Sequence, residues 1–328
     1  MKFHWIGLDA PPNHSMGVVN NENRRALGNL GWTEVPRQED ADVVFSFMHQ
    51  GGSVPDLSGR KRVFYICSTT HNSIVKEFVP NYLAISRTPN NYVFLCNHDG
   101  RDAFAKAGVV AHVWNHGVNL DEFKPGAPPP EHPLTFGFVG QGSPFKRHRL
   151  LVDAFLNAFG DDPEEARLRL LMGWGSVEGY PETPDNVELL PMLPRDRMPD
   201  FYRSLHCLAN FSWGESFNLT LLEALACGVP CLVADMPSMY EAPYDRLLTR
   251  IRATRTIKPE ILVGCFFAPK DPSRYAEPPW VYDVALRDAI SALLDFEAHG
   301  NRQGRIDVPP SATWEARIRD QVLPAILG

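Results

Sequence analysis

The sequence predicts an α/β fold made of two doubly wound, parallel-sheet domains. Short apolar runs alternate with helical patterns along the whole chain, which is typical of β-α-β units. The chain has 328 residues, enough for two domains of ordinary size. A proline-rich segment, 123–130, separates two such series and predicts the linker between the domains. We therefore expect two Rossmann-like domains that face an interdomain cleft, with a ligand at the carboxyl ends of the strands.

The first series of elements gives a domain at 1–127. The first strand is expected at Phe3–Leu8, and a polar loop, 9–17, follows it. A helix then runs to about Leu30, because Gly31 is a good C-terminal breaker. The remaining expected strands are Val43–Met48, Arg62–Cys67, Tyr92–Cys96 and His112–Trp114.

The second series gives a domain at 128–313. Its expected strands are Thr135–Val139, Leu168–Met172, Val187–Leu190, His206–Asn210 and Val229–Val233, with 261–267 as a further strand. A loop at 300–311 leads into a closing amphipathic helix, Trp314–Ile326.

Charge and composition exclude several classes of protein. The 32 basic and 39 acidic residues give a formal net charge of −7, whereas a nucleic-acid binder needs a basic face. The apolar run 224–234 is too short to span a membrane, and the first eight residues are too short for the apolar core of a signal peptide. Six cysteines without a Cys-x-x-Cys pair favour buried thiols in a reducing compartment. We expect a cytoplasmic protein without a transmembrane segment, with peripheral contact at the inner membrane face as an alternative.

The most informative stretch, 213–230, joins an expected strand to an expected helix. Its sequence is Trp-Gly-Glu-Ser-Phe-Asn-Leu-Thr-Leu-Leu-Glu-Ala-Leu-Ala-Cys-Gly-Val-Pro. The helix is expected to begin at about Ser216, and the free amides of its first turn would bind an anion such as phosphate. Glu215 lies beside this anion site and can accept hydrogen bonds from neutral hydroxyl groups. Glu223, about two helical turns further on, suits a vicinal diol such as ribose.

The same two glutamates have a simpler interpretation. Acidic residues are common at helix starts, so Glu215 could be a helix-start residue and Glu223 part of a solvated face. The strand–Gly–Glu–helix–Gly–x–Pro pattern that contains both residues favours the binding site.

Several segments, in order, resemble one enzyme family. The 215–223 segment resembles the Glu-x7-Glu signature of the retaining glycosyltransferases of the family 4 type, which have the two-Rossmann-domain GT-B fold. Segments 115–125, 136–155, 170–175 and 313–315 are similar to other parts of that family in the same order, so the resemblance covers nearly the whole chain. It implies that the closing helix, 314–328, completes the first domain.

The resemblance also implies an activity and a set of site residues. The activity is transfer of a sugar, with retention of configuration, from a nucleotide-diphosphate sugar to an acceptor that is a saccharide, a lipid-linked molecule or a small molecule. The residues it assigns to catalysis are His71, Lys146 and Glu215. The residues it assigns to donor binding are Gly17, Gln141, Lys146, Arg147, Ser216, Phe217, Asn218, Leu219 and Glu223.

The positions of these residues explain the assignments. Lys146 matches the lysine that binds the donor diphosphate, and its ammonium would stabilise charge on the departing phosphate. His71 follows the expected strand 62–67, where the family has its active-site histidine. Gly17 matches the turn before the first helix. Gln141 departs from the family, which usually has an arginine there, so either a neighbouring arginine, Arg147 or Arg149, replaces it or the donor is held more weakly.

The sequence predicts neither a cofactor nor a metal ion. Asp40-Ala41-Asp42 fits an Asp-x-Asp pattern but merely precedes a buried strand, and no His/Cys cluster has metal-ligand spacing. Gly140-Gln141-Gly142 lacks the third glycine of a dinucleotide site.

Two rival functions remain on the same fold: a sugar-phosphate epimerase or phosphorylase, and a nucleotide-sugar-binding protein with weak or no transferase activity. The donor base, the sugar, the acceptor, the oligomeric state and the role of segment 235–279 are not assigned.

Overall fold

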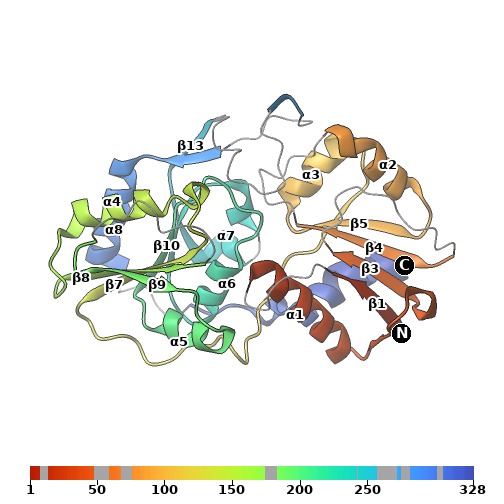
Figure 1. The fold of residues 1–328 in the computed structure, drawn as a ribbon, viewed down its shortest axis with the longest axis horizontal. Coiled ribbons are helices and arrows are strands. Elements are labelled where there is room, and N and C mark those ends of the chain that lie inside the picture. Colours follow the sequence, from red (N-terminus) through yellow and green to blue (C-terminus); the bar gives the residue numbers. More distant parts are fainter. Residues whose placement is uncertain are drawn as a thin grey trace. The chain divides into compact units, whose positions relative to one another are not determined.

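The chain forms two compact units, which we call the first unit and the second unit (Figure 1). The computed structural model describes residues 1–7, 14–47, 59–67, 76–173, 183–241, 243–256, 272–274, 281–300 and 306–328. The first unit holds the described residues of 1–117, 267–279 and 310–328, and the second unit holds those of 118–266 and 280–309. The units divide after Gly117 and not after residue 127, because Phe123 is fully buried against Tyr202 of the second unit.

The first unit is built on a six-stranded sheet in which every pairing is parallel. Its strand order is β2-β1-β3-β4-β5-β6. The strands are β1 (Lys2–Ile6), β2 (Thr33–Glu34), β3 (Val43–Phe47), β4 (Lys61–Ile66), β5 (Asn91–Leu95) and β6 (His112–Val113). The helices before the crossover to the second unit are α1 (Ser15–Asn29), α2 (Val79–Arg87) and α3 (His98–Lys106).

Alternate residues of the central strands supply two apolar layers, one on each face of this sheet. On one face, Trp5, Phe45 and Tyr65 form a ring cluster with Trp114. On the other face, Phe64 of β4 packs with α2 and α3. Because both faces carry apolar side chains, helices cover both of them, as expected for a parallel sheet.

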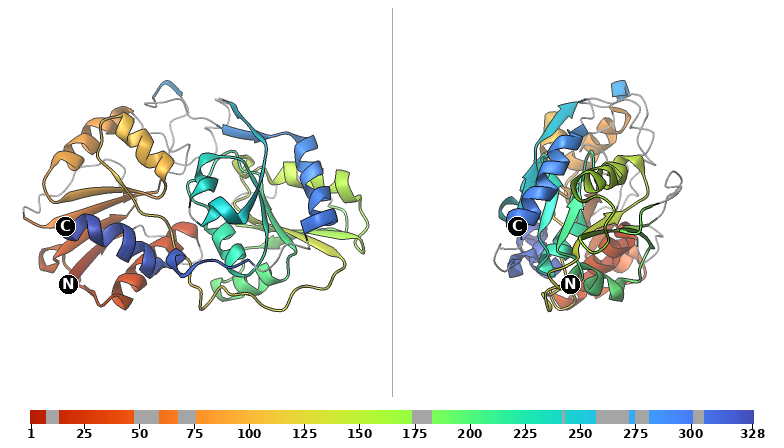
Figure 2. Two further views of the ribbon diagram at one scale, coloured as in Figure 1. Left: turned by 180° about the vertical axis from the view of Figure 1, so that it is seen from behind. Right: turned by 90° about the vertical axis from the view of Figure 1, so that its left-hand side faces the viewer.

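The end of the chain returns to the first unit and lies beside α1 (Figure 2). It consists of α9 (Trp314–Arg317), a π-helical turn (Ile318–Val322) and α10 (Leu323–Leu327). The hydroxyl of Thr313 accepts a hydrogen bond from the backbone N–H of Ala316 at 3.3 Å and so caps the start of α9. Trp314 is fully buried, which fixes this segment to the unit.

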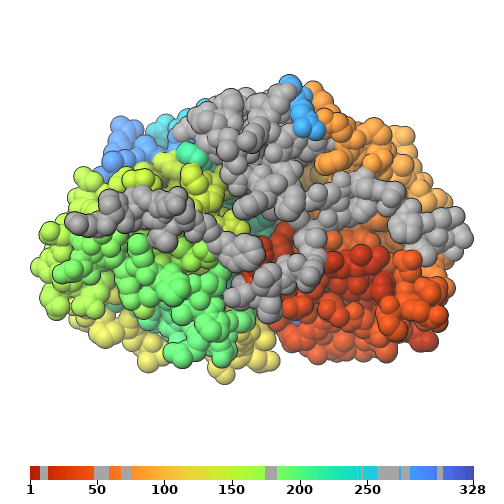
Figure 3. All heavy atoms as spheres, viewed as in Figure 1, coloured from red at the N-terminus to blue at the C-terminus, as the bar shows by residue number. Residues whose placement is uncertain are grey.

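The second unit is also built on a six-stranded, all-parallel sheet, in the order β12-β11-β10-β7-β8-β9. Its strands are β7 (Leu134–Gly140), β8 (Ala166–Met172), β9 (Val187–Pro191), β10 (Cys207–Asn210), β11 (Cys231–Ala234) and β12 (Leu248–Ile251). An antiparallel hairpin pairs β13 (Ala253–Thr256) with β14 (Val281–Val284). The helices are α4 (His148–Phe159), α5 (Met198–Arg203), α6 (Leu219–Ala226), α7 (Tyr244–Leu247) and α8 (Leu286–His299). Helix α5, green in Figure 3, lies at the surface of this unit.

The two parallel sheets confirm the predicted α/β class, and ten of the strands lie within a few residues of the expected positions. The sequence missed β2, β12 and the β13–β14 hairpin. Of these, β12 extends the second sheet and lies in the segment 235–279, to which no role had been assigned. The expected strand at 261–267 lies outside the described residues. In the described part of the chain, no helix is both long enough and apolar enough to cross a membrane.

Gly117 is expected to tolerate no side chain. A Cβ at this position would overlap the backbone N and Cα atoms of Trp314, which are held in place by the buried closing segment. Gly117→Ala should therefore lower the free energy of unfolding by about 3 kcal/mol or more, measured by urea denaturation. Gly28→Ala in α1 is the control, because a Cβ there meets nothing within 4 Å. Alanine at 28 should stabilise the helix by ~0.5–1 kcal/mol, and equal behaviour of the two variants would contradict this account.

Candidate active site

The second sheet reverses its strand order between β7 and β10. From β7, the chain adds β8 and β9 on one side and then returns to add β10, β11 and β12 on the other. The loops that follow β7 and β10 therefore diverge at the carboxyl ends of two neighbouring strands. In open α/β sheets, ligands bind at this switch point. The loop after β7 carries Lys146 and the loop after β10 carries Glu215, so the topology places both predicted residues at the same point.

Lys146 and Glu215 form an ion pair across the switch point. The Lys146 Nζ atom lies 2.6 Å from Glu215 Oε1, and the two side chains are 22% and 8% exposed. The two loops that carry the pair are also joined directly, since the backbone N–H of Trp213 donates to the carbonyl of Phe145 at 3.1 Å. The hydroxyl of Ser143 in turn accepts from the N–H of Phe145 and starts the 3-10 turn that ends at Lys146. The pair is thus held by its own loops and is largely shielded from water.

Helix α6 begins at Leu219, three residues later than the predicted start at Ser216. The reason is the backbone of Asn218, which has left-handed dihedrals of φ 63° and ψ 78° and so ends the preceding loop. The hydroxyl of Tyr244 donates to the carbonyl of Asn218 at 2.7 Å, and Thr220 donates to its side-chain Oδ1 at 2.7 Å. The buried Nδ2 of Asn218 has no hydrogen-bond partner among the described residues. Free N–H groups of this first turn and the Asn218 amide are donors suited to an anion.

The side chain of Glu223 is buried, with 3% of the residue exposed. Its Oε1 is paired with Arg195, and its Oε2 accepts from the hydroxyl of Tyr202 at 2.9 Å. Burial, together with the charge of Glu223, holds the pKa of Tyr202 well above its usual range, so the hydroxyl stays protonated and donates. Arg195 also lies over the ring of Phe123 at 4.4 Å and 3.6 Å from Glu122. Glu223 thus holds a buried network together and does not lie on a solvated helix face.

Arg147 is directed toward the β13–β14 hairpin. It has a left-handed φ of 55° at the start of α4, and its guanidinium pairs with Asp283 of β14. The same Asp283 oxygen accepts from the indole N–H of Trp213 at 3.0 Å, and the guanidinium lies over the Trp213 ring at 4.8 Å. Gln141 directly follows β7 and is half-buried. Arg147 is therefore engaged in a contact between the two loops and the hairpin.

The remaining predicted residues are distributed differently. Gly17 was expected before the first helix, but α1 begins at Ser15, because the ring Nδ1 of His14 accepts from the N–H of Met16 at 3.3 Å and caps it. Gly17 therefore lies inside the first turn of that helix. Phe217 is fully buried against Tyr244, so it offers a backbone group and no side chain to a ligand. His71 lies outside the described residues.

Sequence reasoning missed four residues that shape this site: Arg195, Tyr202, Asp283 and Tyr244. Each contacts a predicted residue from a distant part of the chain; Arg195, for example, is 28 residues from its partner Glu223. No local spacing marks such pairs. Asp283 comes from β14, which the sequence analysis did not recognise as a strand.

Spacing along the sequence marks no His/Cys cluster, but the fold brings three such residues together. In the first unit, one potential ligand atom each from Cys67, Cys96 and His116 lies within 4.8 Å of the others, and all three residues are buried. The two carboxylates of the Asp-x-Asp pattern have separate partners instead of forming such a cluster. Asp40 pairs with Arg37 at 2.8 Å, and Asp42 accepts from the N–H of Lys2 at 2.7 Å.

Comparison with known proteins shows which family and which fold the chain resembles. Residues 133–277 match the family described as glycosyl transferases group 1. The D-inositol 3-phosphate glycosyltransferase of Nocardia farcinica is 30% identical over 222 residues, which cover 61% of this chain and 47% of that protein. The enzyme of the same name from Rhodococcus jostii is 33% identical over 164 residues, covering 43% and 35% of the two chains. This chain spans about half the length of the curated relatives that it matches.

Solved structures with the same fold cover most of the chain. A sucrose-phosphate synthase from Thermosynechococcus elongatus has a TM-score of 0.62 at 13% identity, over 99% of this chain and 96% of that one. Anabaena Alr3699/HepE, solved in complex with UDP and glucose, has a TM-score of 0.55 at 14% identity, over 98% and 82%. AviGT4, a glycosyltransferase involved in avilamycin A biosynthesis, gives 0.52 at 16% identity, over 93% and 99%. The predicted GT-B fold and the predicted resemblance to glycosyltransferases are confirmed.

Removing the Glu223 carboxylate is expected to destabilise the second unit. Glu223→Ala would leave Arg195 without its buried partner and Tyr202 without its acceptor. Because the Arg195 side chain is 25% exposed, we expect a loss of about 2–4 kcal/mol, slightly less than for a fully buried pair. Guanidinium chloride unfolding measures this loss.

Glu188→Ala is the matched control in the same unit. Its carboxylate pairs with Arg169 at 2.7 Å but is 50% exposed, so its removal should cost less than ~1 kcal/mol. A Glu223 variant as stable as the Glu188 variant would show that the buried network contributes little.

Proposed function

We propose that this chain is a retaining glycosyltransferase that moves a sugar from a nucleotide-diphosphate sugar to an acceptor. The observation that carries the proposal is the Lys146–Glu215 pair at the switch point, beside the start of α6. This pair lies inside the segment that matches the glycosyl transferases group 1 family. The names of the relatives support the same class of reaction, because they are glycosyltransferases.

The donor diphosphate would bind between Lys146 and the first turn of α6. An ammonium group has three donors, and one of them already contacts Glu215. The two others and the free backbone N–H groups around Leu219 are available to phosphate oxygens. Negative charge on the diphosphate increases as the sugar departs, so preorganised donors stabilise the transition state more than the bound donor.

Glu215 would hold hydroxyl groups of the transferred sugar. In a nucleotide sugar, the sugar and the diphosphate are joined by a single oxygen, so residues that bind them must lie close together. The 2.6 Å separation of Lys146 Nζ and Glu215 Oε1 meets this requirement. The bond that breaks would lie next to the pair, with the ammonium on the phosphate side and the carboxylate on the sugar side.

Glu223 is our candidate for binding the ribose diol of the donor, although its carboxylate already has hydrogen-bond partners within the protein. Its two oxygens already accept from Arg195 and Tyr202. A ribose hydroxyl would therefore bond to the second lone pair of an oxygen or replace Arg195 as its partner. Gln141, Ser216, Phe217 and Asn218 would contribute the rest of the donor site, mainly through backbone groups and the Asn218 amide.

The anomeric configuration would be retained if the acceptor attacks the face of the sugar from which the diphosphate departs. The leaving phosphate would then take the proton of the acceptor. A double displacement needs a free carboxylate as nucleophile and a second carboxyl group as acid. Glu215 and Glu223 are both engaged in ion pairs, which disfavours these roles.

A second candidate is a nucleotide-sugar-binding protein without turnover. Two observations favour it: Gln141 occupies the position at which related enzymes usually have an arginine, and the charge of Lys146 is partly neutralised by Glu215. Kinetics separate the two candidates, as described below.

Donor binding is expected to raise the melting temperature of the protein. UDP-glucose, GDP-mannose and ADP-glucose are tested in parallel, and UDP-glucose comes first because the Anabaena neighbour was solved with UDP and glucose. A ligand at 100 times its Kd stabilises the folded state by about 2.7 kcal/mol, which calorimetry resolves easily. If none of the nucleotide sugars shifts the transition at millimolar concentration, neither a transferase nor a binding protein is supported.

Lys146→Ala is expected to lower kcat by about 100- to 1000-fold with a smaller effect on KM for the donor. Release of the nucleoside diphosphate by hydrolysis of the donor, in which water accepts the sugar, provides the assay until the acceptor is identified. Lys124→Ala removes an exposed ammonium from the same unit and should leave kcat unchanged. A Lys146 variant with normal kcat and a raised KM would show that this lysine contributes to donor binding and not to the chemical step.

Magnesium and manganese ions should not stimulate the reaction. The diphosphate is expected to be held by N–H groups and Lys146, which take the place of a divalent ion. The rate should be the same with Mg²⁺, with Mn²⁺ and with EDTA present during the assay. Loss of activity in EDTA that Mn²⁺ or Mg²⁺ restores would overturn this part of the proposal and return attention to Asp40 and Asp42.

A further inference from the structure

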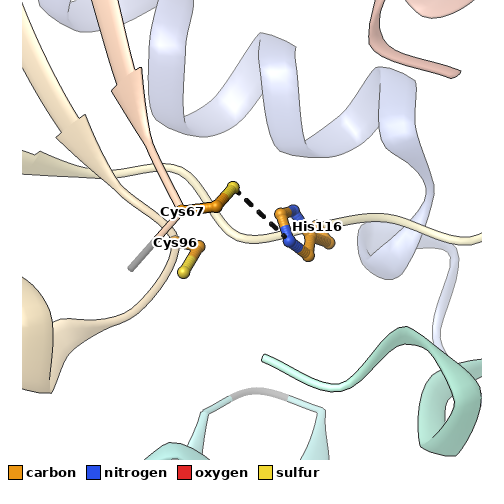
Figure 4. Close-up of side chains that lie close together, drawn as sticks. All are labelled: Cys67, Cys96 and His116. Atoms are coloured by element: carbon orange, nitrogen blue, oxygen red, sulfur yellow. Dashed lines mark hydrogen bonds between the residues drawn. The ribbon is translucent and has the colours of Figure 1, made fainter. Parts of the chain in front are cut away.

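Three metal-ligating side chains meet at the carboxyl edge of the first sheet (Figure 4). Cys67 directly follows β4 and Cys96 directly follows β5, and the register pairs the last residues of these strands, Ile66 with Leu95. His116 lies three residues after β6, the next strand in the sheet. The exposed fractions of the three residues are 3%, 1% and 5%. Adjacent parallel strands thus bring together residues that are far apart in the sequence.

The hydrogen bonds around His116 determine which ring nitrogen faces the thiols. The hydroxyl of Tyr65 donates its single proton to the carbonyl of Trp114 at 2.8 Å, because that oxygen can only accept. The same hydroxyl lies 2.7 Å from His116 Nδ1 and therefore accepts from an Nδ1–H group. The other ring nitrogen, Nε2, then carries the lone pair, and it lies 3.8 Å from Cys67 Sγ.

This arrangement matches a metal-ligating histidine. Such a histidine typically donates its second ring N–H to an oxygen, which orients the ring and fixes the tautomer. Bond lengths of about 2.3 Å to sulfur and about 2.0–2.1 Å to nitrogen put ligand atoms roughly 3.5–3.8 Å apart in a tetrahedral site. The Sγ–Nε2 distance is already 3.8 Å, and all three ligand atoms lie within 4.8 Å of one another. Small side-chain rotations would complete the geometry.

We propose that Cys67, Cys96 and His116 bind one zinc ion. Binding would displace the two thiol protons to solvent and form two Zn–S bonds and one Zn–N bond. A complex of Zn²⁺ with two thiolates and a neutral imidazole has no net charge, which suits a site with so little exposure to water. Sulfur and imidazole ligands select zinc over magnesium or calcium, which prefer oxygen. The fourth position would hold a water molecule.

The zinc site is distinct from the proposed donor site. It belongs to the first unit, whereas Lys146 and Glu215 belong to the second. Its function would be to hold the ends of β4, β5 and β6 together, so this inference does not rest on the proposed function.

The test is zinc binding by the intact chain. Protein purified without chelator is analysed for metals by mass spectrometry, and metal-free protein is titrated with Zn²⁺ against a chromophoric chelator. We expect about one zinc ion per chain. Co²⁺ should give a sulfur-to-cobalt charge-transfer band, and X-ray absorption of the wild-type zinc protein should show two sulfur ligands. These wild-type measurements remain decisive if a ligand variant fails to fold.

Three variants locate the site. Cys67→Ser should weaken zinc binding by more than ~100-fold, since it removes a ligand directly. Tyr65→Phe keeps the ring that stacks on Trp114 but removes the oxygen that orients His116, so it should weaken binding by about 10- to 100-fold. Cys207→Ser is the matched control, because it removes an equally buried thiol in the second unit and should leave zinc binding unchanged.

Three results would overturn the proposal. The first is no zinc uptake by folded wild-type protein. The second is equal loss of affinity in the Cys67 and Cys207 variants. The third is a Cys67–Cys96 disulfide in protein that binds no zinc, which would make the cluster a redox pair.

Discussion

The position of β7 in the second sheet is the constraint on which the candidate site depends. Because β8 pairs with one side of β7 and β10 with the other, the loops that follow β7 and β10 leave the sheet in opposite directions. The Lys146–Glu215 pair, the start of α6 and the contact between Phe145 and Trp213 all follow from that single reversal. The chemistry we propose needs a cation close to a carboxylate and to free N–H groups, and the topology brings Lys146 to Glu215, which is 69 residues further along the chain and directly precedes the start of α6.

The two ion pairs of the second unit have different roles: Lys146–Glu215 is the pair proposed to bind the donor, and Arg195–Glu223 stabilises the fold. Glu223 belongs to α6 and is buried, and its two carboxylate oxygens bond to Arg195 and Tyr202, which anchors the helix. Glu215 lies nearer the surface and shares one contact with a lysine that has further donors available. A diphosphate can compete for Lys146 at modest cost, whereas separating Arg195 from Glu223 would leave a buried charge unpaired. This difference explains how two glutamates eight positions apart, on the same loop and helix, can have unequal roles.

Much of the fold could be predicted from the sequence, because buried parallel strands appear as short apolar runs and β-α-β units repeat them regularly. The strands β2 and β12 and the β13–β14 hairpin were missed, because polar, partly exposed residues interrupt them and leave no continuous apolar run. Within the site, the sequence identified Lys146 and Glu215 through a family signature, yet it placed the start of α6 at Ser216. The left-handed backbone of Asn218 decides that start, and asparagine signals such a conformation only weakly. Arg195, Asp283 and the Cys67–Cys96–His116 cluster depend on strand order, which spacing along the chain does not reveal.

Hydrogen–deuterium exchange with and without the nucleotide sugar that most raises the melting temperature tests the central claim most directly. If the donor binds at the switch point of the second sheet, exchange should slow in peptides that cover 141–147 and 214–221. The β7 and β8 strands beneath them, already protected in the core, should change little. Protection of both loops together is the result that the account predicts. A donor that stabilises the protein while leaving both loops unprotected would contradict it, because the ligand would then bind elsewhere.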